Sequence, residues 1–394
     1  MRHAEDTIID GGVQGTRFVI NYMRNLRDML SGDTKSPVNL STKWDGAPAI
    51  FAGIDPSDGL FFVAKKSIFN KNPKVYKTSE DIDADTSGDL NVKLKLALVE
   101  LPKLGIRDVI QGDFLYAKED IKKTTIDGES YITFHPNTIA YAVPKGSKLA
   151  DTILKSEIGV VWHTVYRGDS FETMSASFGE EIAGKLKNVE SVWSVDAIFK
   201  DISGVASFTK DENDAITKIL SNAGTIFQKI PASVLNGIAE NETRRVRINV
   251  FINTKIRKGE QIRNPSAFVD DLIIALDTYF ETEADKKKTE RGKQATHSTR
   301  DEVMKYFQEN KKSDLVAMFT LYNYIVEAKL IIISKLNKVQ NLKTFLKTKN
   351  GYEVTGQEGF VAIDHLGKNA IKLVDRLQFS KANFSIDYIK GWQR

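Results

Sequence analysis

The feature that most constrains the fold is a change in the spacing of apolar residues that occurs twice along the 394-residue chain. From about residue 38 to 170, short β-rich segments are separated by turn signals such as Asp55-Pro56-Ser57-Asp58-Gly59. From 175 to 349, apolar residues recur three and four positions apart, which predicts helices, and from 350 to 394 the β pattern returns. We therefore predict an α+β protein in which one β-rich domain, residues 1–174 and 350–394, is interrupted by a mostly helical insertion, residues 175–349.

Three segments refine this prediction. Apolar positions at helical spacing predict an amphipathic helix over residues 7–31. Residues 246–252 alternate apolar and polar as in a strand, so the state of this segment stays open. The apolar run 330–333 is flanked by charged residues and is too short to span a bilayer, which favours a buried helix segment and no membrane partner.

Composition narrows the class of protein. The chain has no cysteine, which excludes disulfides and thiolate metal sites and fits a cytoplasmic location. Its first residues lack the apolar core of a secretory signal. The net charge of +4 is compatible with a polyanionic partner but does not identify one. The five histidines include no pair at metal-ligand spacing, so no zinc site is predicted.

The segment Ser41–Ile50 places Lys43 and Asp45 two residues apart, beside a glycine and between two apolar segments. A surface lysine needs no such setting, whereas a nucleophilic lysine needs a pocket that tunes its charge. The four residues Lys43-Trp44-Asp45-Gly46 resemble motif I of the covalent nucleotidyltransferases, the superfamily of ATP-dependent DNA ligases, RNA ligases and mRNA capping enzymes. The resemblance implies that Lys43 attacks the α-phosphate of a nucleotide and becomes a lysyl-nucleotide.

Further motifs of this superfamily follow in the expected order. Together they imply an ATP-grasp-like nucleotidyltransferase domain of the ligase type, built on antiparallel sheets. The segments similar to motifs Ia, III, IIIa, IV and V are Phe62–Ser67, Val109–Leu115, Val160–Gly168, Glu358–Val361 and Ile371–Val374.

The resemblance also implies roles for single residues. Glu358 is expected to hold Mg²⁺ or Mn²⁺, since hard cations prefer carboxylate oxygens and phosphates. Asp113 is expected either to bind the ribose hydroxyls or to help hold the metal. Trp162 either offers a flat face for stacking on a purine or packs in the core, and His163 is a weaker candidate for the stacking role. The catalytic residues are expected to be Lys43, Asp45 and Lys372, and the ATP contacts Thr42, Lys43, Gly46, Lys66, Asp113, Trp162, Glu358 and Lys372.

Attack by Lys43 requires a neutral amine, so its surroundings matter. Nearby cations such as Lys66, Lys372 and Mg²⁺ favour the neutral form, whereas Asp45 favours the charged one. The same cations would neutralise the triphosphate and the charge that develops during phosphoryl transfer.

Two departures from the family pattern stand out. Val374 occupies the place of the second motif V lysine, and we expect Lys368 or Arg376 to replace it. No C-terminal OB-fold domain is expected after Arg376, so the helical insertion is a candidate for the second wall of the site.

These observations favour an ATP-dependent polynucleotide ligase, with RNA slightly preferred over DNA by analogy alone. The alternatives are nucleotidyl transfer to another acceptor, as in a GTP-using capping enzyme or a protein-modifying enzyme, and a non-catalytic nucleic-acid-binding module of the same fold. A basic stretch in the insertion either follows a nucleic-acid backbone or forms a solvated face. Its cations are Arg244, Arg245, Arg247, Lys255, Arg257, Lys258 and Arg263.

Overall fold

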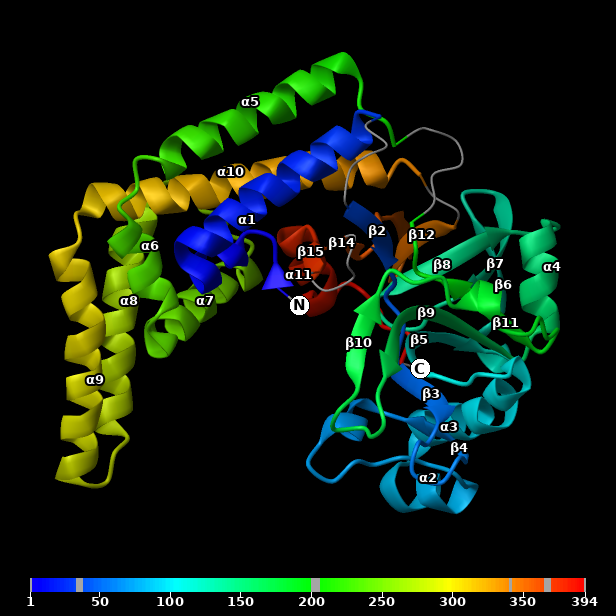
Figure 1. Ribbon diagram of the computed structural model, residues 1–394. Coiled ribbons are helices and arrows are strands. Elements are labelled where there is room, and N and C mark those ends of the chain that lie inside the picture. The colour runs from blue at the N-terminus through cyan, green and yellow to red at the C-terminus, as the bar shows by residue number, and fades with distance from the viewer. Residues whose placement is uncertain (1, 33–37, 200–205, 340–341, 365–369, 393–394) are drawn as a thin grey trace. The chain divides into compact units, whose positions relative to one another are not determined.

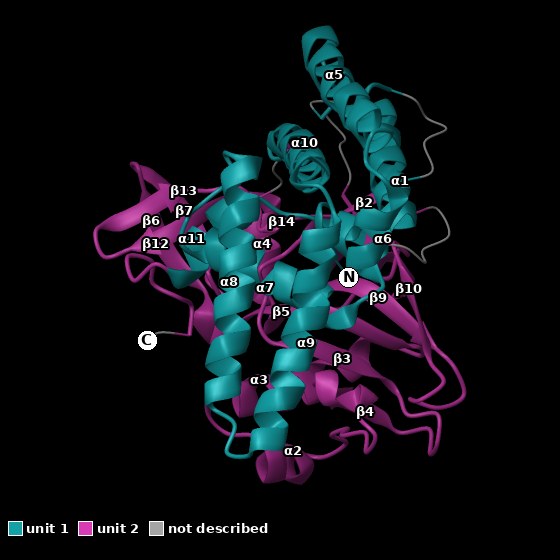
Figure 2. Cartoon of the chain, turned by 90° about the vertical axis from the view of Figure 1, so that its left-hand side faces the viewer, with its two compact units in different colours: residues 1–38, 204–338, 371–384 teal, residues 39–203, 339–370, 385–394 magenta. Residues whose placement is uncertain are grey.

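The computed structural model describes residues 2–32, 38–199, 206–339, 342–364 and 370–392. Helices and antiparallel sheets give a mixed α+β protein, as predicted (Figure 1). Two compact units are distinguished by colour in Figure 2. Unit 1 comprises residues 1–38, 204–338 and 371–384, and unit 2 comprises residues 39–203, 339–370 and 385–394.

Unit 1 is built almost entirely from helices. The helix α1 packs against α5, α6, α7 and α10, and α8 packs against both α9 and α10. A short parallel pair joins β1 (Arg2–His3) to β15 (Ala370–Leu373). The helices are α1 (Asp6–Leu30), α5 (Lys210–Phe227), α6 (Ala232–Ala239), α7 (Glu242–Arg257), α8 (Pro265–Asp285), α9 (Glu290–Glu309), α10 (Lys312–Leu336) and α11 (Arg376–Phe384).

The predicted opening helix is confirmed as α1, with one feature that its periodicity does not reveal. Gly12 interrupts the helix with φ 56° and ψ −138°, and the next amide, Val13 N–H, donates to Asn236 Oδ1 at 3.0 Å. A Cβ atom built on Gly12 would lie 2.5 Å from that same Oδ1. The kink therefore needs glycine both for its positive φ and for the close approach of α6.

The long helix α10 contains the apolar run 330–333, in which Ile332 and Ile333 are buried as predicted. The helix is longer than that run indicates, and by length and composition alone it could cross a membrane. Half of its most apolar window is buried inside the protein, where α10 packs against α1, α5 and α8. This packing is that of a core helix in unit 1.

Unit 2 contains two antiparallel sheets and a smaller strand pair. In the first sheet the order is β10-β9-β5-β3-β4, with β11 pairing β9 in parallel, and in the second it is β13-β12-β8-β7-β6. Separately, β14 (Gly359–Asp364) lies beside β2 (Val38–Lys43). The strands of the first sheet are β3 (Ala49–Ile54), β4 (Phe61–Ala64), β5 (Val109–Ala117), β9 (Ile158–Arg167), β10 (Ser175–Phe178) and β11 (Val192–Asp196). Those of the second are β6 (Lys122–Ile126), β7 (Glu129–Phe134), β8 (Ile139–Pro144), β12 (Lys343–Thr348) and β13 (Gly351–Val354).

The first sheet is covered on both faces by apolar side chains. One face carries Phe114 and Val160 and packs against residues of α2 (Ser79–Asp85) and α3 (Gly88–Glu100). The other face carries Leu115 and Val161, which pack with residues of β7, β8 and α4 (Lys148–Lys155). Because side chains alternate along a strand, Asp113 shares the face of Leu115 and points toward the second sheet.

The two units divide the chain differently from the predicted domains. The apolar face of α1 is buried against other helices, so α1 belongs with the helical unit and not with the β-rich one. Residues 175–199 carry β10 and β11 and belong to unit 2, although the prediction placed them in the helical insertion. The segment 246–252 is part of the helix α7.

Candidate active site

Lys43 and Glu358 meet in unit 2 because their strands are neighbours. Lys43 ends β2, and Glu358 immediately precedes β14. The Lys43 Nζ atom forms an ion pair with Glu358 Oε2. The Glu358 side chain is 6% exposed, whereas that of Lys43 is 27% exposed. The lysine is thus the accessible partner, held by a buried carboxylate that is far away in sequence.

Asp45 is held by the loop that precedes β8. Its Oδ2 accepts hydrogen bonds from the N–H groups of Thr138 and Ile139, both at 2.7 Å, and its Oδ1 accepts from Asn137 Nδ2 at 2.8 Å. Its own N–H donates to the Tyr141 hydroxyl at 2.8 Å. Burial raises the pKa of Asp45, while these hydrogen bonds and Lys43 oppose the rise. The carboxylate therefore anchors the residues that follow Lys43.

Asp113 lies on β5 beside this loop. A Cβ atom on Gly46 would lie 2.5 Å from Asp113 Cβ, which explains why the motif has glycine at this position. The same approach is fixed by two backbone hydrogen bonds: the Ala47 N–H donates to Phe114 O, and the Phe114 N–H donates to Pro48 O, both at 2.9 Å. Burial raises the pKa of Asp113 to about 7, with Lys43 opposing the rise and Glu358 and Asp45 adding to it. Three carboxylates and one ammonium thus influence each other across a small volume.

His163 is on this side of the sheet and Trp162 is not. The His163 Nε2 atom lies 3.8 Å from Asp113 Oδ2, and burial, with Lys43 adding to it, lowers the pKa of His163 to about 4. Trp162 is fully buried in the hydrophobic core with Phe114 and Val160. The stacking role predicted for Trp162 does not fit this position, and His163 is the aromatic residue of motif IIIa that reaches the site.

Four residues of the site were assigned no role from the sequence, and three of them lie outside the predicted motifs. The ring of Trp44 packs 5.1 Å from that of Tyr141, beside Lys43 in the sequence. Asn137 and Tyr141 hold the Lys43 loop, as described above. Lys390 is a buried lysine, and its pKa is lowered by burial, with the charge of Asp45 opposing the shift. Trp44 and Asp45 lay within a predicted motif, but nothing in the sequence marked Asn137, Tyr141 or Lys390.

The remaining predicted nucleotide contacts lie on separate elements. Thr42 is half-buried, and its N–H donates to Ala197 O at 2.7 Å. Lys66 is exposed at the start of a 3-10 helix, Lys66–Phe69. Lys372 lies on β15 in unit 1, in register with His3. Of the two substitutes considered for the missing motif V lysine, Lys368 lies outside the described residues.

The prediction that the other substitute, Arg376, replaces the missing lysine is wrong. Its side chain is buried in unit 1, where the guanidinium pairs with Asp6 at 2.8 Å and with Glu5 at 3.3 Å. It also donates to Asn253 Oδ1 at 2.6 Å. A guanidinium held by these acceptors does not provide the predicted phosphate contact.

Several cations of the basic stretch on and after α7 form contacts inside unit 1. Arg244 is buried, lies 4.2 Å from the centroid of the Tyr306 ring and bonds to Gly237 O. Lys255 pairs with Glu260 and Asp271. These two side chains serve the helical packing, which corrects their predicted role as contacts to a nucleic-acid backbone. Arg245 bonds to Ala239 O, Arg247 stacks on Tyr279, and Arg257 and Lys258 are exposed.

The donor set at Lys43 suits a divalent cation that is also bound by a phosphate. Glu358 and Asp113 provide two carboxylates, and Mg²⁺ commonly takes one or two carboxylates together with substrate phosphates and water. Within the described residues, no group of three or more His, Asp or Glu side chains is arranged to hold a metal ion. Glu358 and Asp113 are therefore the residues of this site that could hold such a cation.

Comparison with known proteins gives one match. A family model described as "Family of unknown function (DUF6267)" matches residues 1–388. No curated protein and no solved structure matches the chain.

Proposed function

Because the chain belongs to DUF6267, a family of unknown function, the site is the basis on which we propose that the protein is an ATP-dependent polynucleotide ligase acting through Lys43. The observation that carries the proposal is the convergence of Lys43, Asp113 and Glu358. These residues come from three distant segments, each singled out by a separate motif, and unit 2 brings them together. The ligase-type nucleotidyltransferase fold is part of the same proposal.

In the first step, Lys43 Nζ attacks the α-phosphorus of ATP. The N–P bond forms as the bond from that phosphorus to the bridging oxygen breaks, pyrophosphate leaves with the electron pair, and Nζ loses a proton. A protonated amine has no lone pair, so Lys43 must first transfer a proton to Glu358 or to solvent, which ends its ion pair with Glu358 before attack. Bound Mg²⁺ would neutralise phosphate charge, and Glu358 and Asp113 are the residues that would hold it.

Two further steps complete the reaction. A 5′-phosphate oxygen of the polynucleotide attacks the same phosphorus, and Lys43 leaves as the amine and regains its proton. A 3′-hydroxyl then attacks the 5′-phosphate and releases AMP. The exposed Arg257, Lys258 and Arg263 are predicted cations that remain suited to a nucleic-acid backbone, with RNA favoured slightly over DNA. A cytoplasmic location, where ATP is present, belongs to this proposal.

The test is covalent labelling. The protein is incubated with Mg²⁺ and ATP radiolabelled at the α-phosphate, then denatured and separated by electrophoresis. We expect label on the wild type and none on Lys43→Arg, which keeps a cation beside Glu358 but removes the nucleophile. The matched control Lys145→Arg, at an exposed lysine of unit 2, should label normally.

The outcomes separate the competing functions. Label from GTP instead of ATP would indicate the capping-type alternative. Label that persists in Lys43→Arg would refute Lys43 as the nucleophile, and absence of label on the wild type with both nucleotides would favour the non-catalytic module. Release of the label by RNA or DNA carrying a 5′-phosphate would identify the acceptor.

A further inference from the structure

A cavity of about 320 Å³ lies within unit 1. It is enclosed by α7, α8, α10, the start of α11 and residues 260–262. Its volume is at the lower end of the range found for small-molecule sites. Much of its wall is apolar, formed by Ile252, Ile256, Phe268, Val326, Leu330 and Leu377.

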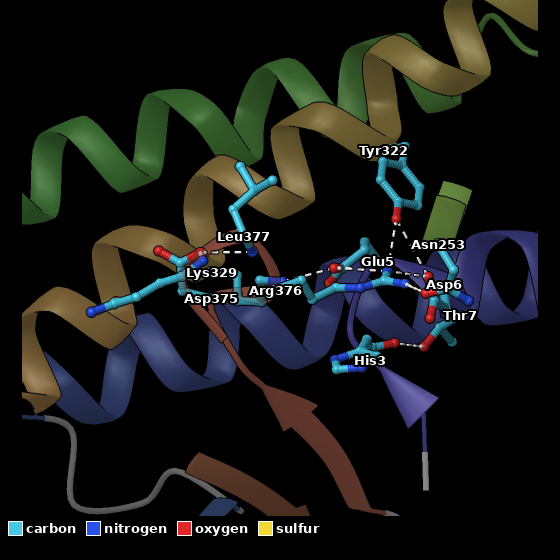
Figure 3. Close-up of polar contacts among 11 residues, drawn as sticks. His3, Glu5, Asp6, Thr7, Asn253, Tyr322, Lys329, Asp375, Arg376 and Leu377 are labelled. Atoms are coloured by element: carbon cyan, nitrogen blue, oxygen red, sulfur yellow. Dashed lines mark hydrogen bonds and ion pairs between the residues drawn. The ribbon is translucent and has the colours of Figure 1, made fainter. Parts of the chain in front are cut away.

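One wall of the cavity is a buried ionic network (Figure 3). Lys329 Nζ donates to Glu5 Oε1 at 2.7 Å, and both side chains are 1% exposed. Arg376 Nη1 donates to Asp6 Oδ1 at 2.8 Å and to the Tyr322 hydroxyl at 3.0 Å. Buried charges are stable only when paired in this way. The cations of this wall are therefore already neutralised by carboxylates of the chain.

The other donors that line the cavity are also occupied. Lys255, at the mouth, pairs with Glu260 at 3.0 Å and with Asp271 at 3.1 Å. Asn323 Nδ2 donates to Ile262 O at 2.7 Å. An incoming anion would thus meet cations that already have anionic partners.

Acceptors, in contrast, are left over. Glu5 Oε2 is buried and has no hydrogen-bond partner among the described residues. Asp375 accepts from the N–H groups of Leu377 and Gln378 through Oδ1, which leaves its Oδ2 without a donor in the described chain. Glu327 is exposed at the mouth and forms no ion pair with any described residue. The lining therefore contains more acceptor capacity than the chain itself satisfies.

We propose that this cavity binds a small organic cation, an ammonium or amidinium group attached to an apolar body. The apolar walls would cover the body, and the N–H groups of the cation would supply the donors that the acceptors of the lining lack. Four acidic side chains line the cavity, Glu5, Glu260, Glu327 and Asp375, against three basic ones, so the charge balance also favours a cation. This site is separate from nucleotidyl transfer at Lys43 and does not depend on it.

The test compares two probes of matched shape and opposite charge, phenylbutylamine and phenylbutyrate, by calorimetry and thermal unfolding of the whole protein. We expect the amine to bind with a dissociation constant of about 1 mM or lower and to raise the melting temperature, because a ligand that binds only the folded state stabilises it. Phenylbutyrate should do neither. Equal or tighter binding of phenylbutyrate, or no binding of either probe, would overturn the proposal.

Variants locate the binding site. Leu330→Trp fills the cavity and should abolish amine binding, and Val326→Phe repeats the test on the same wall if the first variant does not fold. Glu327→Gln should weaken amine binding about fivefold, the upper range for an exposed ion pair. Glu309→Gln, at an exposed glutamate of α9 that does not line the cavity, should bind as wild type does. Unchanged amine binding in the cavity-filling variants would place the amine elsewhere and refute the assignment.

Discussion

The carboxylate of Asp45 connects the strand that carries Lys43 to the loop before β8. Three donors converge on its two oxygens, and two of them are backbone N–H groups of Thr138 and Ile139. A side chain at this position satisfies all three donors only if both of its terminal atoms are hydrogen-bond acceptors. The residue thus holds the nucleophile loop in place, whatever part it takes in the reaction.

We expect Asp45→Asn to lower the free energy of unfolding by about 1–3 kcal/mol, because the new amide N–H₂ must face a donor on one side. Chemical denaturation measures this difference. Asp169→Asn, at an exposed aspartate without a bond among the described residues, is the control and should change stability little. An unchanged midpoint in Asp45→Asn would show that the loop is held by other contacts.

His135, in the same loop, gives a pH dependence of known sign. Burial lowers its pKa to about 4, while a hydrogen bond to Thr138 O opposes the shift. Between pH 6.5 and 4 the unfolded chain therefore binds a proton that the folded chain does not, and stability falls as the pH falls. Replacing His135 with Gln should remove up to about 1.4 kcal/mol per pH unit of this slope. Denaturation of both proteins at several pH values measures it, and parallel curves would contradict the assignment.

The sequence motifs predicted the carboxylates near Lys43, those of Asp113 and Glu358, better than they predicted which aromatic residue of motif IIIa faces the site. Strand alternation explains the failure at Trp162, because Trp162 lies two residues after Val160 and shares its face, in the core with Phe114. The motif resemblance did not specify which face of the strand packs in the core, and that assignment comes only from the tertiary fold. Lys390 was missed for a similar reason, since it is brought to Asp45 only by the tertiary fold.

Among the elements, α1 shows how a glycine is required by its surroundings. The backbone at Gly12 takes a positive φ, and Asn236 on α6 bonds to the amide that the kink exposes. Gly11, one residue earlier, has no atom within 4 Å of a built Cβ. Two adjacent glycines in one helix therefore have different structural requirements.

We expect Gly12→Ala to destabilise the protein by about 1–3 kcal/mol or more, because a side chain is strained at this φ and meets Asn236. Gly11→Ala is the matched control and should be neutral or stabilise by up to about 1 kcal/mol, since alanine is the better helix former. Thermal unfolding of the pair measures the difference. Equal melting temperatures would mean that the kink relaxes without cost.

The segment 246–252 shows why periodicity was ambiguous in α7. Ile248 and Ile252 are buried, whereas Val246 and Val250 are exposed. Residues four apart share one face of a helix and also one face of a strand, so the buried pair satisfies both patterns. Together with the exposed valines, the isoleucines gave the apolar–polar alternation of a strand. Packing against the other helices of unit 1 favours the helix that the structure has.

For the whole molecule, the main organisational feature is that each unit is assembled from three separate parts of the chain. The sequence predicted one interruption of the β-rich part. It could not predict that α1 packs with helices that begin after residue 206, because an amphipathic helix does not specify its partner.

We expect residues 206–339, produced alone, to be helical but loosely packed, because the surfaces of α5, α6 and α10 that α1 covers would face water. Dye binding to exposed apolar surface and a broad thermal transition would show this state. Fusion of residues 2–32 to the fragment through a flexible linker should reduce the dye binding. A sharp transition of the unfused fragment at the temperature of the full chain would contradict the expectation.

Because the parts of each unit are separated along the chain, the helices of unit 1 are synthesised at different times. The residues between α1 and Lys210 must be translated before α5 exists, which takes on the order of 10–40 s at typical ribosome rates. Throughout that interval the apolar side of α1, including Val19, Met23 and Leu26, has no helical partner from unit 1 to cover it. We therefore expect the apolar side of α1 to be open to association with other chains during this interval.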